Sequence, residues 1–186
     1  MDKKKIAGLV IAAIMVLSIL GVVVDFGTQP KAQKMPYGDY KFTPTQQGYT
    51  TKIDGKEFIF FYFPGDIEYY AVPESVKQLL QAPVYTITYD PNSNITQNLA
   101  EAQYYLEFQL ADIKIIERGL TNNANTTLPQ KTCADATAAQ PVILLRQGDE
   151  STITAQDSCI ILQALDKYDI YREAERIVYQ LLGVMK

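Results

Sequence analysis

The sequence predicts an α/β protein, in which an N-terminal transmembrane helix precedes one α/β sandwich domain with a mixed sheet. Three observations predict this fold class: an uncharged apolar stretch, a strand–helix–strand pattern in mid-chain and an amphipathic helix at the end. The predicted parts are a cytoplasmic N-terminus (residues 1–5), a transmembrane anchor (6–24), a stalk (25–38) and an extracytoplasmic α/β domain (39–186).

The anchor is predicted from Ile6–Val24, nineteen residues without charge or proline. As a helix this stretch would be about 28 Å long, close to the roughly 30 Å hydrocarbon core of a bilayer. Three lysines, Lys3–Lys5, stand directly before it, and basic residues beside a span favour the cytoplasmic side. The predicted topology therefore places the N-terminus in the cytoplasm and the rest of the chain outside. A cleaved signal peptide and a buried helix remain as alternatives.

A hairpin is predicted at the start of the folded domain, after a stalk rich in Pro, Gly, Gln and Lys. Tyr49–Ile53 and Lys56–Phe63 flank Asp54-Gly55, a dipeptide that accepts the positive φ angles of a two-residue turn. The second arm is apolar on both faces, so it is expected in a sheet interior covered by helices.

A strand–helix–strand unit follows a short predicted helix at Pro73–Gln81. Val84–Pro91 is rich in β-branched residues and tyrosine, and Asp112–Gly119 again has strand character. Between them, a helix is expected from about Asn98, with apolar residues at helical spacing: Leu99, Ala102, Leu106, Leu110 and Ile113. This order implies a parallel pair of strands.

The last third of the chain predicts a second hairpin, a further strand and a closing helix. Pro141–Gln147 and Ser151–Ala155 would pair through the turn at 148–150, and Cys159–Ala164 would add a strand. Asp169–Leu182 has the apolar stripe of an amphipathic helix. The expected order is therefore ββ-α-β-α-β-ββ-α.

Composition restricts the possible chemistry. The formal net charge is −4, which argues against a basic surface for binding nucleic acid. Histidine is absent, so the chain lacks Ser-His and Cys-His nucleophile pairs and the commonest zinc ligand. No phosphate-binding loop, dinucleotide fingerprint or nucleophile elbow is present. Close acid pairs, such as Asp166 and Asp169, fall where turns or helix starts favour acids. The sequence predicts no cofactor, no metal site and no catalytic residue.

Cys133 and Cys159 are the two cysteines of the chain. An even pair outside the cytoplasm favours a disulfide. Two alternatives stay open: a reactive thiol, which would lack a histidine partner and the Cys-x-x-Cys spacing, and two buried free thiols.

Two glycosylation sequons stand in predicted loops, at Asn94-Ile95-Thr96 and Asn125-Thr126-Thr127. Asn94 and Asn125 are therefore candidate glycosylation sites if the host cell glycosylates proteins outside the membrane.

From Val84 onwards, the order strand, helix, strand, loop, Pro-led hairpin and helix resembles the thioredoxin fold, over about 100 residues. Pro141 stands before VILLRQGDESTI, where that family has a cis-proline, so the resemblance implies a cis-proline here. The family's Cys-x-x-Cys would follow the first strand of this unit, where the chain has Asp90–Asn94. The resemblance thus implies a thioredoxin-like fold without the redox motif.

As a whole, the chain also resembles uncharacterised single-pass membrane proteins of archaea. The segments that carry this resemblance are Cys133–Thr137, before the predicted second hairpin, and the closing Tyr179–Gly183. It implies a cell-membrane setting and no particular function.

Three functional hypotheses follow. The first is a non-enzymatic extracytoplasmic module that binds protein partners in a membrane or envelope assembly. The second is a thioredoxin-like redox or chaperone-like helper that uses Cys133 or Cys159. The third is a binder of small ligands or glycans through some of the thirteen tyrosines, which a cluster of three or more exposed rings would support.

Overall fold

The computed structural model describes residues 14–15, 33–122 and 126–186. The predicted cytoplasmic N-terminus and anchor, at 1–5 and 6–24, lie outside these residues except for Ile14 and Met15. In the part that is described, no helix has the length and apolar character needed to span a membrane. Lys34–Lys186 form one compact unit.

The predicted fold class is wrong in its architecture. The described chain is α/β, but it contains two separate sheets instead of one sandwich with a single mixed sheet, and it shows no membrane-spanning helix. The two sheets part because β4 is followed by a 3₁₀ turn at Pro64–Asp66. Pro64 lacks a backbone N–H and fixes its own φ, which ends strand pairing at this point.

The first sheet is antiparallel, with the strand order β1-β2-β3-β4. Its strands are β1 Met35–Tyr37, β2 Tyr40–Thr45, β3 Gly48–Ile53 and β4 Lys56–Phe60. The hairpin predicted around Asp54-Gly55 is confirmed, and both turn residues have positive φ angles, of 50° and 82°. β1 occupies residues assigned above to the stalk, because Gly38, at φ 54°, allows a tight turn into β2.

The second sheet is mixed, with the order β6-β5-β7-β9-β8. Its strands are β5 Val84–Tyr89, β6 Ile115–Arg118, β7 Val142–Gln147, β8 Thr152–Gln156 and β9 Cys159–Ala164. β5 is parallel to both β6 and β7, and β7 is parallel to β9. The predicted strand–helix–strand unit is confirmed, with helix α3, Thr96–Leu110, between β5 and β6.

The predicted hairpin between 141–147 and 151–155 is wrong. β7 pairs in parallel with β9, and β8 pairs with β9 through the tight turn at Asp157, where φ is 51°. The reason lies in burial: five of the six β9 residues are buried, whereas β8 alternates and suits an edge. The Pro-led hairpin on which the thioredoxin resemblance depended is therefore not formed.

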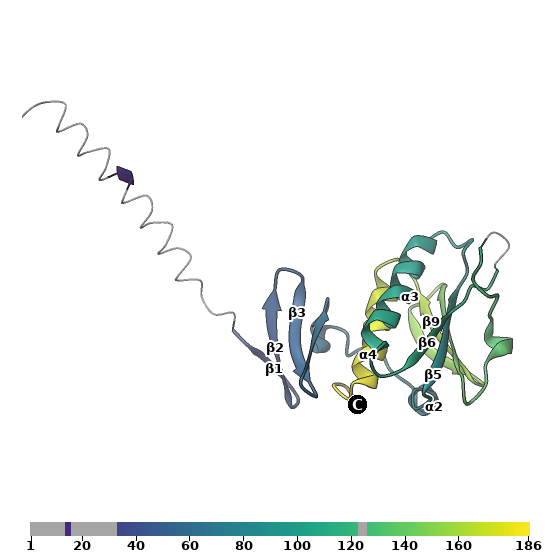
Figure 1. Cartoon of the computed structure of the whole chain (residues 1–186), viewed down its shortest axis with the longest axis horizontal. Coiled ribbons are helices and arrows are strands. Elements are labelled where there is room, and N and C mark those ends of the chain that lie inside the picture. The colour runs from purple at the N-terminus through teal and green to yellow at the C-terminus, as the bar shows by residue number, and fades with distance from the viewer. Residues whose placement is uncertain (1–13, 16–32, 123–125) are drawn as a thin grey trace, which may run out of the picture. The chain divides into compact units, whose positions relative to one another are not determined.

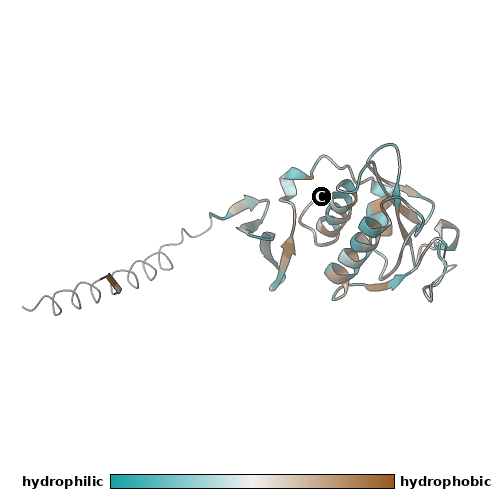
Figure 2. Cartoon of the chain, turned by 90° about the horizontal axis from the view of Figure 1, so that it is seen from above, coloured by the Kyte–Doolittle hydropathy of each residue, from teal (hydrophilic) through white to brown (hydrophobic). Residues whose placement is uncertain are grey.

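Two helices, α3 and α4 (Asp169–Leu181), lie between the two sheets (Figure 1). Figure 2 shows the two helices from a second direction, each with hydrophobic and hydrophilic residues. From the first sheet, Phe60 stacks on Tyr179 of α4, with ring centroids 4.2 Å apart. The second sheet contributes buried apolar residues to the same core: Tyr85, Ile87, Ile143, Leu145, Ile160 and Leu162. The short helix α2, Glu74–Leu79, contacts β8.

The other face of the second sheet carries a smaller apolar cluster of Val142, Cys159 and Ile161. Cys133 packs against it from a 3₁₀ turn at Cys133–Asp135. The Thr88 hydroxyl donates a hydrogen bond of 2.8 Å to the Lys131 carbonyl, which holds the same segment on the sheet. A loop segment, instead of a helix, therefore covers part of this face.

Candidate functional site

An apolar groove of about 560 Å³ lies where β4 meets α3. It is called the aromatic groove below, and its main side chains are Ile59, Phe61, Tyr104, Tyr105, Phe108 and Tyr171. Gln47, Glu101 and Gln109 complete its lining. Three rings of the groove are more than half exposed: Phe61 at 55%, Tyr104 at 60% and Phe108 at 69%. Such a concentration of exposed apolar surface marks interaction sites more often than isolated exposed residues do.

The alternation of β4 supplies one wall of the groove. Phe60 is fully buried and faces the core, so Ile59 and Phe61, the residue directly after β4, point to the opposite face. β4 was expected in a sheet interior, but it is an edge strand, and Ile59 is 47% exposed. That expectation is wrong, because no helix fully covers the face on which Ile59 and Phe61 lie.

Helix α3 supplies the second wall. Its buried stripe includes Leu99, Ala102, Leu106 and Leu110, as the sequence predicted. Tyr104 and Phe108 are four residues apart, so they share another helix face. Their rings stack with centroids 6.3 Å apart, and both are exposed. The Phe61 and Tyr105 rings, 5.5 Å apart, join the two walls.

Glu175 of α4 fastens the floor of the groove. Its carboxylate accepts hydrogen bonds from the backbone N–H groups of Phe61 and Tyr62, at 2.9 and 2.7 Å, and from the Tyr105 hydroxyl at 2.9 Å. Burial raises the pKa of Glu175 to about 7, although these three hydrogen bonds act to lower it. The same carboxylate thus positions Phe61 and Tyr105, one on each wall.

A second link joins the walls through Gln109. This side chain is 8% exposed, and its amide donates a hydrogen bond of 2.6 Å to the Ile59 carbonyl. The bond occupies a carbonyl on the free edge of β4, where an unpaired acceptor would otherwise remain. Because polar links of this kind hold both walls, the groove is preformed.

Glu101 is the acidic residue of the groove lining. It accepts hydrogen bonds from the Tyr171 hydroxyl and from the Gln97 amide. Both bonds hold the pKa of Glu101 below its ordinary value, with the Tyr171 bond the larger cause. The carboxylate is therefore ionised at neutral pH and adds a negative charge beside the rings.

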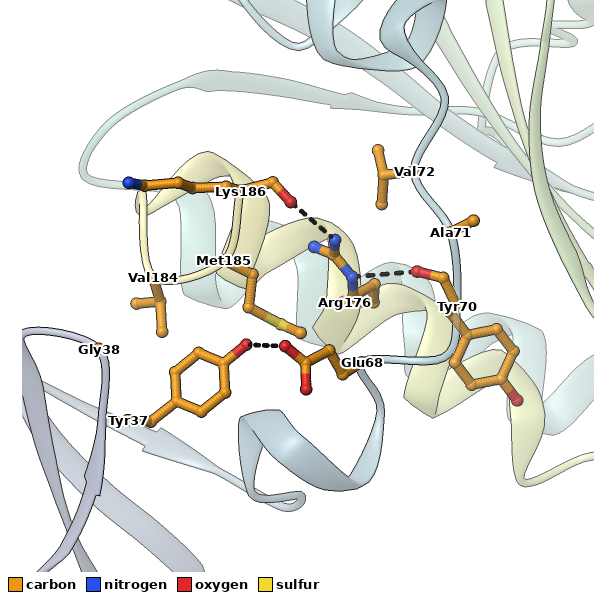
Figure 3. Close-up of a pocket in the computed structure, with 10 residues that line it drawn as sticks. All are labelled: Tyr37, Gly38, Glu68, Tyr70, Ala71, Val72, Arg176, Val184, Met185 and Lys186. Atoms are coloured by element: carbon orange, nitrogen blue, oxygen red, sulfur yellow. Dashed lines mark hydrogen bonds between the residues drawn. The ribbon is translucent and has the colours of Figure 1, made fainter.

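A second pocket, of about 600 Å³, surrounds the buried side chain of Arg176. Figure 3 shows the guanidinium between the segment at Tyr70 and the C-terminal residues, with hydrogen bonds to the carbonyls of Tyr70 (3.1 Å) and Lys186 (3.5 Å). On the other side of the pocket, the Tyr37 hydroxyl donates to Glu68 at 2.9 Å. The bonds of Arg176 tie chain segments together, so we assign it a structural role.

Two carboxyl groups on α4 have opposite protonation behaviour. Glu173 is fully buried, and neither carboxyl oxygen has a hydrogen-bond partner. Burial, and then the charge of Asp169, raises the pKa of Glu173 to about 9. For Asp169, burial is outweighed by hydrogen bonds from Ser151, Tyr70 and Arg172, which lower the pKa.

Separated pKa values in a carboxyl pair are typical of acid–base catalysis. Asp169 does line a pocket of about 500 Å³ with Ser151 and Thr152. Glu173, however, does not line that pocket and has no exposed surface. It cannot reach a ligand there, so the pair is not assigned a catalytic role.

The cysteines form the predicted disulfide. Cys133 and Cys159 are joined, with Cα atoms 5.2 Å apart, and Cys159 is fully buried at the start of β9. Asn94 is exposed in the turn before α3, and Asn125 lies outside the described residues. The peptide bond before Pro141 is trans, so the cis-proline that the thioredoxin resemblance implied is not observed.

Sequence reasoning missed the aromatic groove, although one signal for it was present. Tyr104 and Phe108 fall outside the apolar stripe of α3, so two aromatic rings four residues apart were available on its solvent side. The wall that β4 supplies could not be predicted from the sequence, because the second face of an apolar strand can be either covered or exposed.

Within the described ranges, no group of three or more acidic or cysteine side chains is arranged to hold a metal ion. Comparison of the chain with protein-family models, with curated proteins and with solved structures finds no match in any of the three.

Proposed function

We propose that this protein is a non-catalytic binding module that works outside the cytoplasm and holds a partner protein in the aromatic groove. The observation that carries the proposal is the exposure of Phe61, Tyr104 and Phe108 around one preformed groove. Rigid aromatic side chains dominate the binding energy of many protein interfaces because they bury large areas at a small entropic cost.

The disulfide supports a location outside the cytoplasm. Cys133–Cys159 is a covalent bond across the second sheet and its covering segment, and such bonds persist in oxidising compartments. The redox hypothesis has less support, because Cys159 is fully buried and reactive thiols need solvent access.

A binder of small ligands or glycans is the second candidate, because three exposed rings on one surface also suit a sugar or a flat ligand. The polar part of the lining favours the first candidate. Among the amide and carboxylate side chains of the lining, Gln109 already donates to the Ile59 carbonyl, and Glu101 already accepts from Tyr171 and Gln97. Few groups remain to hydrogen-bond the hydroxyls of a glycan.

The double variant Tyr104→Ser/Phe108→Ser is expected to lose at least one partner protein that the native chain retains. Both side chains are exposed, so their removal should leave the fold intact while it removes two aromatic anchors. Each anchor is worth about 2 kcal/mol or more where it is a hot spot. The measurement is quantitative mass spectrometry of proteins that co-purify with the full chain from its own cells.

The matched control is Ile115→Ser, which removes an apolar side chain of similar exposure, 63%, from β6 outside the groove. This variant should retain the partner. Recovery of the same proteins with all three chains would contradict the proposed function.

A further inference from the structure

The aromatic groove combines exposed rings with negative charge. No lysine or arginine is among its lining residues, and α3, which supplies one wall, contains none between Thr96 and Leu110. Glu101 is ionised and is held by two neutral donors, the Tyr171 hydroxyl and the Gln97 amide. None of the ion pairs between described residues involves Glu101. Its charge is therefore available to a cation from outside.

The rings add to this preference. The face of an aromatic ring is electron-rich and attracts a cation within about 6 Å of its centroid. Tyr104 and Phe108 stack at an interplanar angle of 26°, and both are more than half exposed. Glu101 lies on the same helix, three residues before Tyr104 and seven before Phe108, so its carboxylate and the rings share one face of α3.

Building on the proposed function, we propose that the partner segment inserts an arginine side chain, flanked by apolar residues, between Glu101 and the Tyr104/Phe108 rings. Charge complementarity carries this choice: the groove has one carboxylate that is in none of the described ion pairs, electron-rich ring faces and no cation in its lining. Arginine suits both features, because its planar guanidinium stacks on a ring while its N–H groups donate to a carboxylate. The apolar flanks of the segment would cover Ile59 and Phe61.

Two peptides test the proposal: acetyl-Leu-Arg-Leu-amide and acetyl-Leu-citrulline-Leu-amide, which have nearly the same shape but differ in charge. Each is titrated into the full-length chain at low salt, and the aromatic resonances of Phe61, Tyr104 and Phe108 are followed by NMR. The arginine peptide is expected to bind roughly 2- to 30-fold more tightly than the citrulline peptide, the range typical of cation–π contacts.

Two variants test whether the preference for the arginine peptide comes from the charge of Glu101 and from the ring of Phe108. Glu101→Gln removes the charge and keeps the size, and Phe108→Leu removes a ring and keeps an apolar side chain. Each should reduce the ratio of the two affinities towards one, while unchanged resonances elsewhere show that the fold is intact.

Equal binding of both peptides would overturn the arginine proposal and leave the proposed function standing. Absence of a saturable shift with either peptide up to its solubility limit would also overturn it. The proposed function fails on a separate result, namely an unchanged set of co-purified proteins in the Tyr104→Ser/Phe108→Ser variant.

Discussion

Glu173→Gln is expected to stabilise the protein in a strongly pH-dependent way, the largest effect of any single substitution considered. The stability of the variant minus that of the native chain is expected to be about 3 kcal/mol larger at pH 7 than at pH 4.5, and about 5 kcal/mol larger at pH 9. Above about pH 10 the difference should stay constant, because Glu173 is then ionised in the folded state as well. The measurement is urea unfolding of both chains at a series of pH values.

The sign follows from proton binding. Glu173 is buried without hydrogen-bond partners, and its pKa rises from 4.5 to about 9 on folding. Between these two values the folded state holds a proton that the unfolded state has released, so stability falls by about 1.4 kcal/mol for each pH unit. The contribution is complete below pH 4.5 and is lost as pH rises towards 9. Glutamine has no proton to release and shows none of this loss.

Glu150→Gln serves as a control, because Glu150 is exposed in the turn between β7 and β8. Its difference from the native chain should remain small at every pH. Glu175 and other groups also titrate, but they are present in both chains and cancel when Glu173→Gln is compared with the native chain. A difference that does not change between pH 4.5 and 9 would show that Glu173 is ionised, and therefore solvated, in the folded protein.

Local sequence signals predicted the turns and the strand–helix–strand unit. The Asp54-Gly55 hairpin and the parallel pair of β5 and β6 form as expected, because turn chemistry and the helical apolar stripe act over short distances. The burial of Leu99 and Leu106 on α3 was predictable for the same reason.

Long-range choices were not predictable in this way. β7, β8 and β9 are all strands at the expected places, but their pairing depends on which of them is covered on both faces. Sequence proximity favoured a hairpin of β7 with β8, whereas Ile160 and Ile161, which are buried on opposite faces of β9, suit that strand to an interior position beside β7. The aromatic groove depends on the same kind of information, because Phe61, directly after β4, lies on the face opposite the buried Phe60 and is exposed only where no other element covers that face.

Buried polar groups were the least visible feature of the sequence. Glu173 and Glu175 both lie on α4, two residues apart, and both are completely buried. A helical pattern with acids so close together normally places at least one of them in solvent. Here α4 is enclosed by both sheets, so neither acid reaches solvent, and only the tertiary structure shows that Glu175 is well hydrogen-bonded whereas Glu173 is not.

Loss of the Cys133–Cys159 disulfide is expected to lower the free energy of unfolding by about 3 to 4 kcal/mol, the value for a separation of 26 residues in the chain-entropy model. The bond matters for the native state too, because it fastens the loop segment that contains Cys133 to Val142 and Ile161, on the face of the second sheet that points away from the helices. Without it, proteases should cut first within this segment.

Two measurements separate the effect of the covalent bond from that of the buried sulfur atoms: reduction of the native chain, and the variant Cys133→Ala/Cys159→Ala. Reduction removes the covalent bond and keeps both sulfur atoms, whereas the variant also removes buried volume at Cys159 and should lose about 1 kcal/mol more. Reductant should have no further effect on the variant, which controls for other actions of the reagent. If the reduced native chain unfolds at the same urea concentration as the oxidised one, the hydrogen bond of Thr88 to Lys131 and the apolar cluster already hold the segment. The disulfide would then contribute nothing to stability, and its persistence would reflect only the compartment in which the protein works.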